Sequence, residues 1–288
     1  SASSAPAIFL PGKISTGSNE GCSLFFSGAR SFLWRTSSDG SALLLLLEDK
    51  DGRWQPPRRV HIFDDHAGVW DFTLAPDGDW IYFTSDKEAS KAARNNLWRV
   101  RLESGDFLTP EMLGLSVNSD WFDGYPSITR EGDLYFFRRN PEELADCDLY
   151  VSYRANDRSK AAVRLGASVN TTSLEYDPFI AADGSFLIFS SDRPEGDGEG
   201  DLYISFLMEG KQWSEPVNLG PEINSAAEES RPSVTLDGQY FFFTSTRINE
   251  PTLPPGTPPA RSMPGSGSRD IYWVTTDFVE NLKAHKTQ

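Results

Sequence analysis

Acidic side chains recur at a fixed distance before a series of turn glycines in this sequence. The turn glycines are Gly78, Gly132, Gly184 and Gly238, and Ala29 takes the same place in a degraded first copy. Nine residues before these positions stand Glu20, Val69, Asp123, Glu175 and Glu229. Seven residues before them stand Cys22, Asp71, Tyr125, Asp177 and Arg231. Carboxylates gathered in one place can act as acid and base on a sugar, hold a divalent cation or bind a partner.

A second group of reactive side chains lies in VHIFDDHAGVWD, residues 60–71. His66 with Asp64, Asp65 and Asp71 has the donor atoms for a divalent metal site, or for a histidine that an acid orients as a general base. The alternative is a surface loop in which these side chains make local turns.

Alternating acids also occur in PEGDGEGD, at Asp197, Glu199 and Asp201. Oxygen ligands at alternate positions are typical of calcium loops, but the full spacing of a helix-loop-helix calcium site is missing. We therefore expect a flexible acidic hairpin, and Ca²⁺ or another divalent metal stays open as a cofactor.

Aromatic side chains accompany the acids, at Trp70, Trp121, Phe122, Tyr125 and Tyr176. A flat ring at the edge of a site can stack on a sugar, whereas a ring inside the fold only adds to packing. We expect Trp121 and Tyr176 to be the exposed rings.

The elements that position these residues repeat with a period near fifty. The turn glycines are 54, 52 and 54 residues apart, each between two short strands, as in DFTLAPDGDWIYFTSD. A third strand opening with Asn or Asp follows (NLWRVRL, DLYVSYR, DLYISFL, DIYWVTT), and a weaker fourth ends in Leu-Gly. Short strands rich in Tyr, Phe, Ile and Val at this period predict a β-propeller, whose blades bury both faces only against their neighbours.

The two ends of the chain predict how the ring closes. A leucine stands ten residues before the acid in the N-terminal segment, as it does between later copies, at Leu10, Leu113, Leu165 and Leu219. The last copy lacks an outer strand, so we expect residues 6–14 to complete it. The prediction is one all-β domain over 1–288, a five-bladed β-propeller of four-stranded antiparallel blades near 15–62, 66–113, 121–165, 173–219 and 227–288.

The motif Asp-Gly-x-x-Ile-Tyr-Phe-x-Ser-Asp followed by Asp-Leu-Tyr resembles the TolB-type, WD-repeat-like propeller repeat, over residues 68 to 276. That family includes periplasmic binding and scaffold proteins, peptidase-associated propellers and polysaccharide lyases. The resemblance therefore implies a fold more firmly than an activity. It also implies a periplasmic or extracellular protein, although no signal peptide is visible in this chain.

Propeller topology places both sets of residues at one mouth of the central channel. The first strand of each blade lines the channel, and the linker that enters it lies on the face opposite the Asp-Gly turns. Repeated acids at the nine-back position can simply cap the linkers. The seven-back set differs from blade to blade, and such variation within a symmetric frame favours a binding site.

Composition excludes some partners. Lys and Arg total 27 against 42 for Asp and Glu, a net charge of −15. Nucleic-acid binders present a basic face, so no nucleic acid is expected. The longest apolar run, residues 42–47, is too short for membrane insertion. The two cysteines, Cys22 and Cys147, do not have the spacing of metal ligands. For the oligomeric state, a monomer is favoured.

A long irregular segment interrupts the last blade, over residues 248–268. Its proline and glycine density excludes helix and strand. Long loops in compact domains are usually functional or disordered, so a lid and a disordered loop are both open.

Three functions follow. The first is a binding or scaffold module that presents the acidic, aromatic-rimmed mouth to a protein or glycan; the sequence has no Gly-x-Ser-x-Gly or His-Glu-x-x-His motif. The second is a carbohydrate-active enzyme, either a hydrolase with Asp177 as base and Glu229 as acid, or a lyase using His66 and Arg231 or a bound metal. The third is a propeller that holds a divalent cation for structural reasons.

Overall fold

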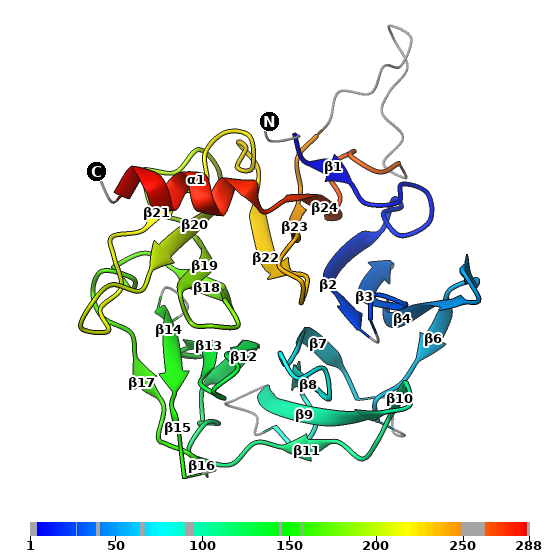
Figure 1. Cartoon of the computed structure of the whole chain (residues 1–288), viewed down its shortest axis with the longest axis horizontal. Helices are drawn as coiled ribbons and strands as arrows, with labels where there is room; N and C mark the ends of the chain where they lie inside the picture. The colour runs from blue at the N-terminus through cyan, green and yellow to red at the C-terminus, as the bar shows by residue number, and fades with distance from the viewer. Residues whose placement is uncertain are drawn as a thin grey trace, which may run out of the picture.

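Five antiparallel sheets stand around one central axis in the computed structural model of the chain, and the first strand of each is innermost (Figure 1). The structure describes residues 5–26, 28–38, 41–63, 67–89, 95–143, 146–156, 158–248 and 263–286. The predicted five-bladed propeller is confirmed. We number the sheets as blades 1 to 5 in chain order.

Blades 1 and 2 each end in two short outer strands. Blade 1 contains β2 (Asn19–Phe26), β3 (Ser31–Ser38), β4 (Ser41–Lys50), β5 (Arg53–Trp54) and β6 (Arg58–Val60). Blade 2 contains β7 (Val69–Leu74), β8 (Trp80–Ser85), β9 (Asn96–Glu103), β10 (Asp106–Phe107) and β11 (Glu111–Met112).

Blades 3 and 4 follow the four-stranded pattern. Blade 3 contains β12 (Phe122–Ile128), β13 (Leu134–Arg139), β14 (Cys147–Ser152) and β17 (Val163–Arg164), and a separate hairpin joins β15 (Arg154–Ala155) to β16 (Arg158–Ser159). Blade 4 contains β18 (Glu175–Ile180), β19 (Phe186–Ser191), β20 (Asp201–Phe206) and β21 (Val217–Asn218).

Blade 5 combines both ends of the chain, as predicted. Its strands are β22 (Glu229–Val234), β23 (Tyr240–Ser245), β24 (Asp270–Thr275) and, at the outer edge, β1 (Ala7–Ile8). The residue pairs are Ala7 with Trp273 and Ile8 with Tyr272. Because β1 supplies the outer strand of this blade, the N-terminus closes the ring.

Side chains in the linkers reinforce the outer strands. Each of three linker asparagines bonds both the N–H and the C=O of a leucine near the start of the third strand of the preceding blade: Asn118 with Leu97, Asn170 with Leu149 and Asn224 with Leu202. In the closing blade Ser15 does this for Ile271, accepting from its N–H at 3.2 Å and donating to its C=O at 3.3 Å. The N-terminal segment therefore reproduces the linker that precedes blades 3, 4 and 5.

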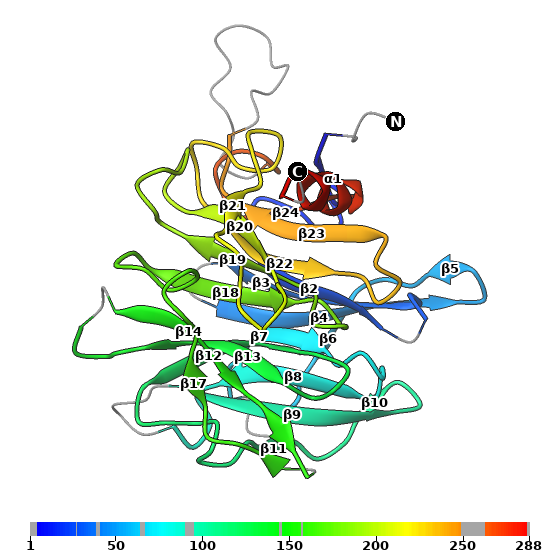
Figure 2. The same ribbon diagram turned by 60° about the vertical axis from the view of Figure 1, so that its left-hand side comes forward.

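A C-terminal helix, which the sequence analysis did not predict, departs from the propeller pattern. Helix α1 (Asp277–Lys286) lies against blades 4 and 5 (Figures 1 and 2). Phe278 and Val279 are buried there, and the Phe278 ring contacts Phe241 edge-on at 5.2 Å. No helix among the described residues is long and apolar enough to cross a membrane.

Closure of the propeller predicts that removing one aromatic ring between blades 1 and 5 lowers the stability of the fold. The Phe9 ring lies 5.1 Å from Phe32 of blade 1 and 5.1 Å from Phe242 of blade 5. Because Phe9→Ala opens a gap between the first and last blades, we expect it to lower the free energy of unfolding by about 2–3 kcal/mol in urea titrations. Leu115→Ala, at a side chain that is 91% exposed, is the control. Equal stability of the two variants would contradict this account of closure.

Candidate functional site

The two faces of the propeller differ in what they carry. The linker into blade 5 lies beside the loop between β19 and β20, where the Glu229 N–H donates to the Gly200 carbonyl at 2.7 Å. We call this face, with its linkers and second loops, the upper face. The opposite face, with the turn glycines, is the lower face, and the channel has a mouth on each.

The four repeated acids cap the linkers into their own blades on the upper face. Glu175 accepts from the Thr171 N–H at 2.9 Å and from the Thr171 hydroxyl at 2.7 Å. The same donor types join Thr16 to Glu20, Ser119 to Asp123 and Ser225 to Glu229. All four acids are buried. The four acids therefore cap the linkers, which was the alternative to a binding role for them.

An arginine joins three of these acids. The pairs are Arg138 with Asp123 at 2.6 Å, Arg193 with Glu175 at 3.3 Å and Arg247 with Glu229 at 3.2 Å. Each guanidinium also lies over two aromatic rings of its own blade, at 4.8–5.5 Å from the ring centres. Burial raises the pKa of Asp123 and Glu175, and their hydrogen bonds and arginines oppose that shift. We call each set of acid, arginine and rings a clamp.

Glu229, predicted as the catalytic acid, lies in the clamp of blade 5. Its Oε1 accepts from the hydroxyls of Ser225 and Ser245 and from Arg247, and its Oε2 accepts from the Ser225 N–H. Both oxygens are therefore engaged inside the fold. Its catalytic role stays a prediction, and we build no site on it.

The five seven-back residues share an unusual backbone conformation. Their φ angles are 43° at Cys22, 48° at Asp71, 50° at Tyr125, 50° at Asp177 and 56° at Arg231. Each lies where the pairing of the first and second strands shifts register. Residues other than glycine seldom adopt positive φ, and a bulge of this kind redirects a side chain. We call these five residues the channel ring.

Contacts between blades show that the channel ring converges. Cys22 donates from its thiol to Asp71 Oδ1 at 3.2 Å, and Arg231 Nε lies 3.9 Å from the same oxygen. The Arg231 N–H donates to Asp177 Oδ2 at 3.3 Å. The Tyr125 hydroxyl donates to the Pro232 carbonyl at 3.1 Å. Side chains of all five blades therefore meet at the upper part of the channel.

The channel ring contains one carboxyl with a raised pKa, and an incompletely hydrogen-bonded guanidinium lies in the ring and another beside it. Burial raises the pKa of Asp177 to about 7, the Asp71 charge adds to the rise and Arg231 opposes it. Arg231 Nη1 and Arg35 Nε are buried and have no hydrogen-bond partner among the described residues. The Arg231 stem lies against Gly21, where an added Cβ would stand 3.2 Å from its Cδ.

The aromatic residues of the upper face differ in exposure. Trp121 is 36% exposed, as expected. Trp70 lies against Gly68 and under Arg35, whose guanidinium is 6.0 Å from its ring centre. The Tyr176 hydroxyl lies against Gly200, so this ring is only partly exposed.

The predicted metal residues give no cluster. His66 and Asp64 lie outside the described residues, as does most of the segment 248–268. Within the described ranges no group of three or more His, Cys, Asp or Glu side chains is placed to hold an ion. Asp201 instead accepts from the Asp197 N–H and the Asn218 amide, as part of the fold.

Arg35 is the site residue that the sequence analysis missed. The register places it opposite Gly21, and the matching second-strand residues of the other blades are Thr84, Phe137, Ser190 and Thr244. Arg35 is the one charged residue among these five equivalent positions, and this was the signal in the sequence that could have identified it.

Comparisons with known proteins agree on the fold. No protein-family model matches the chain, and no curated protein matches it. Among solved structures, a putative TolB from Agrobacterium tumefaciens is 15% identical, with a TM-score of 0.53 over 89% of this chain and 90% of its own. In fold, the protein is a five-bladed β-propeller that resembles this TolB structure.

Two glycosidases resemble this propeller to a similar degree. An alpha-L-arabinofuranosidase from Lactobacillus brevis is 14% identical, with a TM-score of 0.57 over 92% of each chain. A GH43 endo-arabinanase from Bacillus licheniformis is 10% identical, with a TM-score of 0.51 over 88% of this chain and 92% of its own. At these identities the likeness is one of fold.

The clamps predict that replacing a buried arginine lowers the free energy of unfolding far more than replacing an exposed one. Arg193 and Glu175 have side chains 11% and 0% exposed. Because Arg193→Met leaves Glu175 buried without its cation, we expect the free energy of unfolding to fall by about 3–5 kcal/mol. Arg58→Met breaks a pair whose side chains are 52% and 27% exposed, and should cost less than about 1 kcal/mol. Urea titration of both variants tests this, and equal losses would contradict the clamp.

Asp177 predicts a pH dependence of stability. Its pKa is about 7 in the folded protein against an ordinary 3.8, so between these values the native state keeps a proton that the unfolded chain has lost. Its contribution to stability therefore falls as the pH rises through that window. Asp177→Asn cannot titrate, so its stability relative to wild type should increase by roughly 2 kcal/mol from pH 5 to pH 7.

Urea unfolding at several pH values measures this difference. Asp120→Asn, at an exposed carboxylate of the upper face, should stay at a constant offset from wild type. A constant offset for Asp177→Asn as well would show that Asp177 ionises normally in the folded protein.

Proposed function

We propose that this propeller is a binding module whose ligand is a glycan held at the upper mouth of the channel. Asp71, Asp177 and Arg231 form its polar centre, and Trp121 lies on the same face. The observation that carries the proposal is the channel ring itself. The five blades place four kinds of side chain (Cys, Asp, Tyr and Arg) at one backbone position, while the clamps beside them repeat in blades 3, 4 and 5.

The polar centre has the hydrogen-bonding groups that a sugar requires. Carboxylate oxygens accept from hydroxyl groups, and a guanidinium donates to hydroxyl or carboxylate oxygens. Arg231 Nη1, which has no partner among the described residues, supports an added acceptor at this place. A buried donor without a partner costs free energy, so a ligand oxygen would relieve that cost.

The charged residues at this mouth and the fold comparisons both support a glycan ligand. A protein of net charge −15 keeps basic groups at this mouth, where Arg35 and Arg231 are near enough to influence each other's charge state. Both glycosidases that share the fold are named for arabinose polymers or arabinosides. A protein partner at the same face is the other outcome that the experiment separates.

A thermal-shift screen tests the binding proposal. Wild type is heated with neutral arabino-oligosaccharides and with oligogalacturonates. Because a ligand that binds only the folded state stabilises it, we expect a rise in Tm of roughly 3 °C at about ten times Kd. Asp177→Asn and Arg231→Met should lose the rise.

Asp120→Asn is the matched control, since it removes a carboxylate from the same face outside the channel ring, and it should keep the rise. No response to any saccharide in wild type would remove the glycan from the proposal. The search would then turn to a protein partner.

A second candidate function is hydrolysis of the bound glycan. One carboxyl with a raised pKa beside a second carboxyl is the pattern of a glycosidase acid and its partner. Asp177 fits the acid better than the base, and Asp71 replaces Glu229 as its partner because both contact Arg231. Release of reducing ends by wild type and by Asp120→Asn, lost in both Asp177→Asn and Asp71→Asn, would establish it.

A divalent cation at the upper mouth is the third candidate, and the channel ring gives it little support. Arg231 already contacts both carboxylates, Asp71 through its guanidinium and Asp177 through its backbone N–H. A rise in Tm with CaCl₂ that EDTA reverses is the test. The setting that we propose for all three functions is a monomer in the periplasm or outside the cell.

A further inference from the structure

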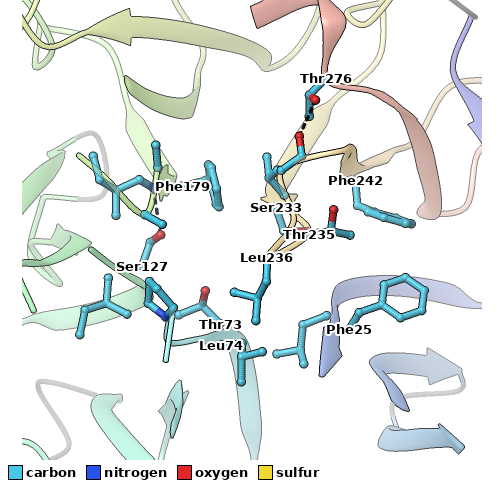
Figure 3. A pocket seen from close by; sticks show the side chains of 18 of the residues that line it. Phe25, Thr73, Leu74, Ser127, Phe179, Ser233, Thr235, Leu236, Phe242 and Thr276 are labelled. Carbon is cyan, nitrogen blue, oxygen red and sulfur yellow. Dashed lines mark hydrogen bonds between the residues drawn. The ribbon is translucent and has the colours of Figure 1, made fainter. Parts of the chain in front are cut away.

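A cavity opens at the lower mouth of the channel, on the face opposite the channel ring. Its volume is about 250 Å³, and its floor is formed where the first strands of all five blades end (Figure 3). The floor side chains are apolar: Leu24, Leu74, Ile128, Phe179 and Val234. An apolar cavity of about 150 Å³ is enough for benzene, so this one can hold a ring with a short chain.

Two features outside the propeller pattern complete the cavity wall. Val279 and Glu280 of helix α1 form one side. Leu236, in the turn of blade 5, projects at the rim with 55% of its surface exposed (Figure 3). The exposed leucine and the helix each lie on one side of the mouth, so this end of the channel departs from the five-fold pattern of the blades.

Three hydroxyl groups in the wall already form hydrogen bonds within the fold. Ser127 Oγ accepts from the Ile180 N–H at 2.9 Å, and Ser233 Oγ donates to the Ser23 carbonyl at 3.3 Å. Thr276 donates to the Gly238 carbonyl at the rim. The wall therefore favours the apolar body of a ligand over a polar one.

Acidic side chains lie in the cavity lining and directly beside it. Among the described lining residues Glu280 is the one charged side chain. Asp77, Asp183 and Asp237 directly follow the lining residues Pro76, Ala182 and Leu236, and all three are exposed. Lys283 lies close enough to Asp183 to favour its ionised form, and hydrogen bonds from Ser185 also lower the pKa of Asp183. These carboxylates favour a cation at the rim.

We propose that the lower mouth binds a small apolar molecule that carries a positive charge, an aryl- or alkylamine. Its apolar body lies on the floor among Leu74, Ile128 and Phe179, and its ammonium group faces Glu280. The site is separate from the upper mouth, so it stands whether or not a glycan binds there.

Isothermal titration with three matched probes tests the proposal: 4-phenylbutylamine, 4-phenylbutanol and 4-phenylbutanoate. They share a body and differ in charge. Because the rim is acidic, we expect the amine to bind with a Kd below about 1 mM and about tenfold or more tighter than the carboxylate. The alcohol should lie between them.

Three substitutions locate the binding. Ala182→Trp fills the mouth from a half-buried turn position and should abolish binding of all three probes. Leu236→Arg, at an exposed position, should weaken the amine at least about fivefold and spare the carboxylate. Glu280→Gln should weaken the amine by a similar factor and leave the alcohol unchanged. Circular dichroism and urea titration establish that each variant is folded.

Two controls separate this site from others. Leu115→Trp adds the same ring to an exposed loop position and should change no Kd. Asp177→Asn, in the channel ring, should also change none. The proposal is overturned if no probe binds at 5 mM, if the three bind equally, or if Asp177→Asn removes binding while Ala182→Trp and Leu236→Arg keep it.

Discussion

The structure depends on one constraint, the bulge that every first strand makes as it enters the channel. Five strands that share one axis leave little room for side chains, and each bulge turns one residue toward that axis. All five residues adopt positive φ without being glycine, and such conformations persist only where surrounding contacts stabilise them. The backbone strain is repeated in every blade, whereas the chemistry at that position is not.

The clamps supply part of the stabilisation that the bulges require. Glu175 and Arg193 join a linker, a first strand and the rings of the second and third strands, and blades 3 and 5 repeat this arrangement. Buried pairs of this kind are costly to break. Since the clamps fix the linkers, residues of the channel ring such as Asp177 and Arg231 can differ between blades without loss of the fold. Repetition at one position and variation two residues later therefore separate the acids that cap the linkers from those that line the channel.

One channel thus has two mouths of opposite character. The upper mouth is polar, with Asp71, Asp177 and Arg231 in contact. The lower mouth is apolar, because the first strands carry Leu, Ile, Phe and Val there and helix α1 covers one side. Alternation of side chains along a strand cannot produce this difference by itself, since both ends lie in the same channel. It arises from which residues the bulge redirects and from elements added outside the repeat.

The sequence by itself determined the number of blades, the closing strand and the upper position of the acids, because turn glycines such as Gly184 and strand periods report local geometry. It also separated Glu175 from Asp177 as members of a constant and a varying set. Only the tertiary structure decided that Glu229 is enclosed by Arg247, that Arg35 lies beside the channel ring and that Leu236 borders a cavity. These facts depend on contacts between residues far apart in the chain, to which no local pattern is sensitive.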